Sequence, residues 1–311
     1  MAHPVFTMPT LGYNGRFANQ LFQYAFLQLC ARRRDAAIQT FPWAGQQLFG
    51  FRDPLVDAVA PVVIDGEAAA DPELYLHRND PLGDLVEFRG FFQYDSHHYR
   101  PYRDFIRQLF VLEPMMRALC EEVVTRLRAG GRPLVALHLR RGDYGHAQFF
   151  RAPARWYGDW LRDRPEPRDP VVYLCSESPA HLAPQFSGQR LFHAGLLPGL
   201  SPRLAFILDF YVLTQADEVA VSNSSFSFMA AMLNERAASF VRPTLEERRL
   251  VAFDPWDAPV VLPRALAAGE QAELDACDRN LAPIAGHKGP HAPSMAHRPP
   301  SVAFGPFCSS A

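Results

Sequence analysis

The chain has 311 residues, of which 48% are hydrophobic and 21% charged, a composition typical of a globular protein long enough for two domains. Its net charge of −2 and the absence of any basic run longer than residues 32–34 argue against a broad nucleic-acid surface. The five cysteines form no C-x-x-C pair, and no run approaches the roughly 20 apolar residues that span a bilayer. We therefore expect a cytoplasmic protein with free thiols, without a transmembrane segment or a signal peptide.

The N-terminal region reads as strand, loop and helix. Residues 5–8 ("VFTM") favour a strand, and from Asn19 onward apolar residues recur at helical spacing. Asn19 is predicted to cap this helix, and the arginines at 32–34 are predicted to end it, where the dipole favours positive charge. In the loop "GRFANQ", Gly15 permits unusual dihedral angles, while Arg16, Asn19 and Gln20 supply one cation and two amides.

A boundary is predicted near residue 131. The pattern favours a helix from about Pro114 to Arg128, and "AGGRP" at 129–133 then interrupts it with two glycines and a proline. We expect an N-terminal domain at 1–131, a C-terminal domain at 132–262 and an extension at 263–311. From about residue 280 the extension is rich in Pro, His, Gly and Ser, so it is expected to be disordered.

Three apolar runs in the C-terminal domain each lead into a polar loop. The runs at 134–139, 171–175 and 218–222 enter "RRGDYG", "SESP" and "NSSFSF", and helical patterns follow at about 201–216 and 225–236. Strands that alternate with helices predict a parallel sheet covered on both faces. The three loops should then meet at the carboxyl edge of that sheet, where functional residues gather.

The loops carry phosphate-binding chemistry, although each has a simpler reading. Arg140 and Arg141 offer guanidinium forks suited to phosphate, but an Arg–Asp ion pair with Asp143 is an equal alternative. Hydroxyls at the start of a helix bind phosphate, but they also cap helices. These hydroxyl-bearing and neighbouring amide residues are Ser222, Asn223, Ser224 and Ser225. Glu177 could accept hydrogen bonds from a base or ribose, or favour the dipole of the helix that Ser178 and Pro179 begin.

Taken together, the motifs resemble a known family. "GRFANQLFQYAF" is similar to the GGLGNQMFQYAF-type signature of alpha-1,2-fucosyltransferases (glycosyltransferase family 11), and its start is closer to the GRFGNQ of protein O-fucosyltransferases. "GFFQYDSHHY" at 90–99 resembles GYFQSEKYF, and "HLRRGDY" resembles HxRRGDY. "SNSSFSFMAAML" at 222–233 resembles SNSSFSWWGAWL. The sequence departs from the family at Ala18, at Phe228 and Met229, and at Glu177-Ser178, where the family commonly has an Asp-Asp pair.

The resemblance implies an α/β fold of GT-B type, with two Rossmann-like domains facing each other across a cleft. It also implies an inverting, metal-independent transfer of L-fucose from GDP-fucose to a galactoside hydroxyl, with no cofactor and with an oligosaccharide or glycan acceptor. Arg140 matches the family's catalytic arginine, His138 matches a nucleotide contact, and the 222–225 loop would bind the diphosphate. Asn19 and Arg16 would lie near the fucose. Weaker matches are Glu177 for guanine and Asp209 for support of a loop.

Some assignments stay open at the level of the sequence. Asp143 could take the proton of the acceptor hydroxyl, or it could hold Arg140 by a salt bridge, which we favour slightly. Arg141 could be structural. The departures from the family leave two alternatives, a transferase for another nucleotide sugar and a weakly active relative that binds GDP-sugars. A peripheral association with a membrane is also left open.

Overall fold

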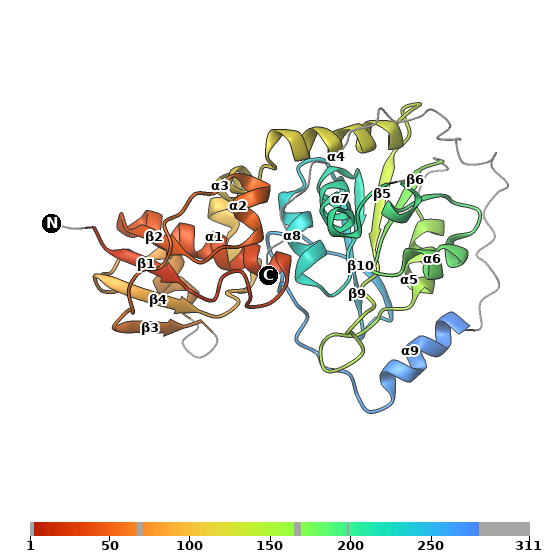
Figure 1. The fold of residues 1–311 in the computed structure, drawn as a ribbon. Coiled ribbons are helices and arrows are strands. Elements are labelled where there is room, and N and C mark those ends of the chain that lie inside the picture. Colours follow the sequence, from red (N-terminus) through yellow and green to blue (C-terminus); the bar gives the residue numbers. More distant parts are fainter. Residues whose placement is uncertain (1–2, 67–70, 165–168, 198, 280–311) are drawn as a thin grey trace.

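The computed structural model of the protein describes residues 3–66, 71–164, 169–197 and 199–279. The chain forms two α/β units, each built around its own sheet, which lie side by side (Figure 1). Helix α4 (Pro114–Leu127) runs along one side of the C-terminal unit. The tail that the sequence predicts to be disordered from about residue 280 lies outside the described residues.

The N-terminal sheet has four parallel strands in the order β2-β1-β4-β3. They are β1 (Val5–Met8), β2 (Ala37–Thr40), β3 (Val62–Asp65) and β4 (Leu85–Arg89). The helices of this unit are α1 (Phe17–Arg34), α2 (Ala44–Phe49) and α3 (Arg103–Leu109). Short turns complete it: the π-helical η1 (Glu73–His77) and the 3₁₀ turns η2 (Ser96–His98) and η3 (Arg100–Tyr102).

The C-terminal sheet has six strands in the order β10-β9-β8-β5-β6-β7, and all pairs are parallel except β9 with β10. The strands are β5 (Leu134–His138), β6 (Val171–Cys175), β7 (Arg190–Phe192), β8 (Glu218–Ala220), β9 (Ser239–Thr244) and β10 (Arg249–Ala252). The helices are α5 (Ala154–Arg162), α6 (Pro179–Leu182), α7 (Pro202–Gln215), α8 (Ser225–Leu233) and α9 (Glu270–Arg279), with 3₁₀ turns η4 (Ala183–Phe186) and η5 (Ala194–Leu196).

Both faces of β5 are buried, and alternate residues point into different cores. Leu134 and Ala136 join the core that continues into the N-terminal unit, while Val135 and Leu137 join the core on the other face. A strand buried on both faces reads as a continuous apolar run, which explains why "LVALHL" was recognisable in the sequence.

Several local predictions are confirmed. The predicted strands appear as β1, β5, β6 and β8, and the predicted helices appear as α4, α7 and α8. Three arginines end α1, as expected. The predicted cap is wrong, because α1 begins at Phe17, Arg16 occupies the N-cap position, and Asn19 lies inside the first turn. Helix α9 was not predicted.

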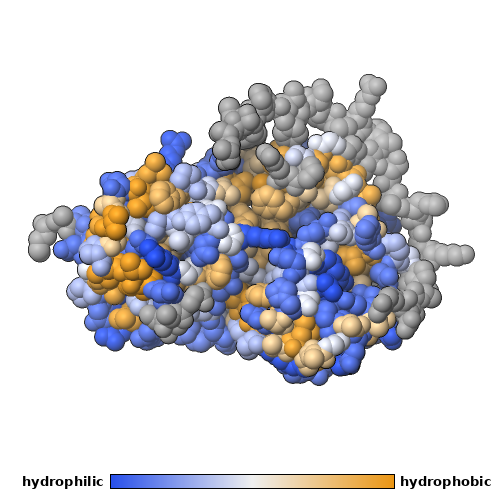
Figure 2. Space-filling view, turned by 60° about the horizontal axis from the view of Figure 1, so that its bottom comes forward, coloured by the Kyte–Doolittle hydropathy of each residue, from blue (hydrophilic) through white to orange (hydrophobic). Residues whose placement is uncertain are grey.

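The surface is mixed. In the face shown in Figure 2, hydrophilic side chains are interspersed with separate apolar patches on both units. On the N-terminal unit, exposed apolar residues include Val62 and Val63 of the edge strand β3. None of the helices in the described ranges combines the length and apolarity needed to cross a membrane.

Candidate functional site

Three polar loops meet at the carboxyl edge of the C-terminal sheet. In the parallel register His138 is level with Cys175, and Leu137 is level with Ala220. The segments that begin at Leu139, Ser176 and Val221 therefore leave the sheet side by side. This is the edge at which open α/β sheets bind their ligands.

Arg140 lies at the centre of this edge. Its Nη2 donates to Asp143 Oδ1 at 2.5 Å, its Nη1 forms an ion pair with Glu177, and its guanidinium lies 5.1 Å from the ring centre of Tyr144. Only 13% of its side chain is exposed. The two carboxylates and the aromatic ring hold the guanidinium in one orientation, as a preorganised cation requires.

Asp143 contacts both units of the chain. Besides Arg140, its carboxylate pairs with Arg16 of the N-terminal loop, with Nη2 and Oδ2 3.2 Å apart. Burial raises the pKa of Asp143, but the charge of Arg140, a backbone hydrogen bond and the charge of Arg16 together outweigh it and lower the pKa below the usual range. The carboxylate is therefore ionised at neutral pH and is a weak proton acceptor.

His138 is neutral at physiological pH. Burial, with the positive charges of Arg140 and Arg141, lowers its pKa to about 3. Its Nδ1 is 2.8 Å from the hydroxyl of Ser222, and its ring packs against Phe226 of α8. The imidazole thus joins the 139–144 loop to the 221–225 loop and provides a hydrogen-bonding group without charge.

Arg141 and Glu177 have mainly internal partners. Arg141 Nη1 donates to the carbonyl of Ala152 at 2.8 Å, and its Nη2 lies 3.6 Å from Asp278 of α9. The backbone N–H of Arg141 donates to Glu177 Oε2 at 3.1 Å. The contacts of Arg141 brace the loop, and Glu177 fixes both the backbone of that loop and the Arg140 side chain.

The 222–225 loop divides into a buried half and a half that faces the N-terminal unit. Asn223 is 1% exposed, and it donates to Gln148 O and accepts from the N–H of Leu262, so its bonds are internal. Ser224 caps α8 by accepting from the N–H of Phe226 at 3.4 Å. Ser225 instead donates across to Asn19 Oδ1 at 2.6 Å.

The N-terminal loop is braced by an amide side chain of helix α1. Gln20 donates to the carbonyls of Gly12 and Gly15, so its side chain connects the loop to the first turn of α1. Gly15 has a φ of +76°, and a Cβ there would lie 2.4 Å from Asn19 Nδ2. A Cβ there would also lie 2.8 Å from both Asn19 Cβ and Phe91 Cε1, so a larger residue would have to displace Asn19 or Phe91 as well as adopt a strained φ.

Asp209 lies on α7, next to the end of β6. Its carboxylate accepts a hydrogen bond from the hydroxyl of Tyr173 at 2.9 Å. Its backbone carbonyl is 3.7 Å from Cys175 Sγ, at the end of β6. Burial raises the pKa of Asp209 to about 7, although the Tyr173 hydrogen bond lowers it. Its contacts are with β6, so it supports the strand that leads to Glu177.

Two residues at this edge were missed by sequence reasoning. Gln93 donates to Asn19 Oδ1 at 2.8 Å, so one amide oxygen accepts from Gln93 and from Ser225. Gln93 lies within the "GFFQYDSHHY" motif, which was the available signal. Tyr144, which lies beside Arg140, follows directly in "RRGDY".

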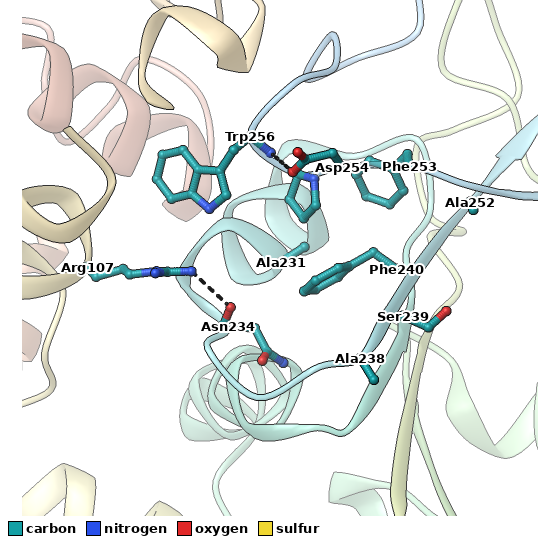
Figure 3. Close-up of a pocket in the computed structure, with 11 residues that line it drawn as sticks. Arg107, Ala231, Asn234, Ala238, Ser239, Phe240, Ala252, Phe253, Asp254 and Trp256 are labelled. Carbon is teal, nitrogen blue, oxygen red and sulfur yellow. Dashed lines mark hydrogen bonds between the residues drawn. The ribbon is translucent and has the colours of Figure 1, made fainter. Parts of the chain in front are cut away.

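A cavity of about 360 Å³ lies elsewhere (Figure 3). Arg107, Phe240 and Trp256 are among the residues that line it, and the Arg107 guanidinium donates to the carbonyl of Asn234. The cavity adjoins the start of β9 and the end of β10, which is antiparallel to β9. This is the amino edge of the sheet, opposite to the loops described above.

The chain is an α/β protein with a largely parallel C-terminal sheet, and in this class ligands commonly bind beyond the carboxyl edge of the strands. The structure is similar to that of the NodZ alpha-1,6-fucosyltransferase soaked with GDP-fucose, with a TM-score of 0.56 and 14% identity over 81% of this chain and 99% of that chain. The fucosyltransferase NodZ from Bradyrhizobium gives a TM-score of 0.53 and 13% identity over 82% and 99%. The predicted GT-B-type α/β fold is thereby confirmed.

Sequence comparison confirms the resemblance that the motifs indicate. The chain is 29% identical over 255 residues to galactoside alpha-(1,2)-fucosyltransferase 1 of Rattus norvegicus, across 72% of this chain and 63% of the relative. The protein of the same name from Leontocebus fuscicollis is 28% identical over 254 residues, across 72% and 65%. The chain thus spans less than two thirds of the length of these relatives. No family model matches it.

Proposed function

We propose that the chain is a fucosyltransferase that moves L-fucose from GDP-fucose to a hydroxyl group of a galactoside. The similarity to named galactoside alpha-(1,2)-fucosyltransferases supports both the reaction and the alpha-1,2 linkage. The observation that carries the proposal is the fixed guanidinium of Arg140, which lies on the same sheet edge as the serine loop at the start of α8.

The donor diphosphate would bind between these two elements. The backbone N–H groups and hydroxyls at the start of α8 favour an anion, and the helix dipole adds to the effect. His138 would contact the nucleotide as a neutral hydrogen-bonding group. Glu177 would accept from guanine with the part of its carboxylate that Arg140 and Arg141 leave available.

Arg140 would act on the leaving group. The bond between the anomeric carbon and the phosphate oxygen breaks, and its electron pair stays on GDP while the sugar becomes oxocarbenium-like. A guanidinium already oriented towards the phosphate stabilises this charge without reorganisation. The acceptor oxygen then bonds to the anomeric carbon from the opposite face, which inverts its configuration.

The proton of the acceptor hydroxyl would pass to the departing phosphate or to water. Asp143 is a weak base because two arginines hold its carboxylate in the ionised form. Its proposed role is to orient Arg140 and Arg16. The charge on the diphosphate is neutralised by arginine in this scheme, so transfer is proposed to need neither a metal ion nor a cofactor.

The N-terminal loop would enclose the sugar. Asn19, held by Ser225 and Gln93, and Arg16, held by Asp143, stand between the two units. The other partner is an oligosaccharide or glycan acceptor rather than a nucleic acid. The described cysteines, Cys30, Cys120, Cys175 and Cys277, are free, and a cytoplasmic setting is part of the proposal.

The test has a binding arm and a turnover arm. GDP should raise the Tm more than UDP or ADP does, and GDP should be released from GDP-fucose in the presence of a galactoside. Equal shifts with all three nucleotides would refute the donor assignment. A selective GDP shift without release over an array of acceptors would leave only a sugar-nucleotide-binding protein.

A further inference from the structure

Two imidazoles and a carboxylate meet in the N-terminal unit, outside the loops described above. Glu73 and His77 begin and end the π-helical turn η1, and His98 ends η2. One potential ligand atom from each of the three residues lies within 4.8 Å of those from the other two. Four residues apart on a single π-helical turn, Glu73 and His77 project from one side of it, and π-helical turns often occur at functional sites.

The orientation of His77 is already fixed. The Tyr102 hydroxyl donates to the carbonyl of Leu76 at 2.5 Å and accepts from Arg33 Nη1 at 3.2 Å. The same oxygen is 3.3 Å from His77 Nδ1, so that nitrogen is the one that carries the proton. The lone pair is then on Nε2. Histidines that bind metals are held in this way by a partner on the other ring nitrogen.

The ligand atoms suit one class of ion. Two imidazole nitrogens and one carboxylate oxygen are the three protein ligands of a zinc site with an open fourth position. The ligand atoms of such a tetrahedral ion are about 3.4 Å apart, given metal–ligand distances of about 2.1 Å. Each pair of ligand atoms lies within 4.8 Å, and Glu73 is exposed and His98 half-buried, so rotations of these two side chains about the His77 ring can bring the ligand atoms to this spacing.

A neighbouring cluster is a poorer candidate. Asp95, His97 and Asp257 also lie close together. The Asp95 carboxylate, however, already accepts from the backbone N–H of His97 at 3.2 Å and contacts its ring nitrogen at 2.8 Å. These bonds cap η2, so the cluster already has a local structural role.

We propose that Glu73, His77 and His98 form a binding site for a divalent transition-metal ion, with Zn²⁺ the best match. The ion would join η1 to the η2–η3 turns and so cross-link segments about 20 residues apart in the sequence. Binding would stabilise the N-terminal unit. The site is independent of the proposed transfer reaction, so metal removal should lower the Tm without abolishing turnover.

The test uses the untagged, metal-stripped full chain without nucleotide. Calorimetric titration with ZnCl₂ should show a site that is weakened at least ~100-fold by His77→Ala or His98→Ala. Tyr102→Phe, which removes the hydroxyl next to His77 Nδ1 together with its bonds to Leu76 and Arg33, should weaken it ~10–100-fold. A Zn²⁺ excess of 100-fold over Kd should raise the wild-type Tm by about 5 °C and leave the Tm of His77→Ala unchanged.

Controls separate this site from other histidines. His181→Ala, at an exposed position on α6, and the triple change His287→Ala, His291→Ala and His297→Ala should retain the site. Unchanged titrations of both His77→Ala and His98→Ala would overturn the proposal, as would loss of the site in the triple variant alone. Loss in His97→Ala with retention in His77→Ala would assign the ion to the Asp95 cluster instead. If His98→Ala fails to fold by circular dichroism, Glu73→Gln and Tyr102→Phe decide the question.

Discussion

Replacing Arg140 by lysine keeps a positive charge at the sheet edge but removes the two-pronged fork. The native guanidinium bonds to Asp143 and to Glu177 at the same time, which an ammonium group at the end of a flexible chain does not reproduce in fixed geometry. If Arg140 stabilises the leaving phosphate, kcat should fall by ~10²–10³ in Arg140→Lys and at least as far in Arg140→Ala.

The effect on stability should be much smaller. Asp143 is 56% exposed and Glu177 33% exposed, so water screens both ion pairs. We expect loss of the cation to cost about 1 kcal/mol of unfolding free energy, or about 2 °C in Tm. A large loss of turnover with a small loss of stability is the signature of a residue that acts on the reacting groups.

The assay is GDP release at saturating GDP-fucose and galactoside, with circular dichroism and melting curves for each variant. Arg162→Lys is the matched control, because Arg162 is 57% exposed on α5 and pairs with Asp159 on its own helix. It should retain full kcat. A folded Arg140→Lys enzyme with near wild-type kcat would refute the role given to Arg140.

Four further outcomes are expected. Asp143→Asn should lower kcat less than 10-fold if the residue only orients arginines; a fall of 10²–10⁴-fold would identify it as the general base. Gly15→Ala should cost ~1–3 kcal/mol more than Gly131→Ala in chemical denaturation, because both glycines have positive φ but only at Gly15 does a Cβ meet other atoms; equal costs would contradict this. Since the pKa of Asp209 is raised to about 7 when folded, its contribution to stability is present below about pH 4 and is lost as pH rises through 7. The Tm of Asp209→Asn minus the Tm of wild type should therefore be larger at pH 8 than at pH 5. The same difference at both pH values would argue against the raised pKa. Turnover should persist in EDTA, and loss of activity that manganese or magnesium restores would disprove metal-independent transfer.

The sheet edge was predictable from the sequence because its determinants are local. A buried strand such as β5 gives a continuous apolar run, and the carboxyl ends of parallel strands must coincide, so the loops after β5, β6 and β8 could be brought together from the pattern alone. The contacts of Asn19 were not predictable. They depend on how the two units pack. This packing places Ser225 against Asn19 of α1, although the two residues are 206 positions apart.

Helix α9 escaped prediction for a different reason. Among the α9 residues whose burial the structure describes, only Leu274 belongs to the apolar core, so the sequence lacks a clear apolar stripe. Polar bonds attach it instead: Asp275 pairs with Arg151 at 2.7 Å, and Gln271 exchanges two hydrogen bonds with the backbone of Arg151. A search based on hydrophobic periodicity does not detect such an attachment.

These attachments bear on how the protein opens locally. Asp278 of α9 accepts from the backbone N–H groups of Ala154 and Arg155 at the start of α5 and lies near Arg141. The segment between β5 and α5 is therefore fastened at one end by the sheet and at the other by α9. We expect this segment and α9 to open as one cooperative unit in native-state hydrogen exchange. The rigidity of the loop that carries Arg140 and Arg141 would then depend on α9, which lies more than 100 residues further along the chain.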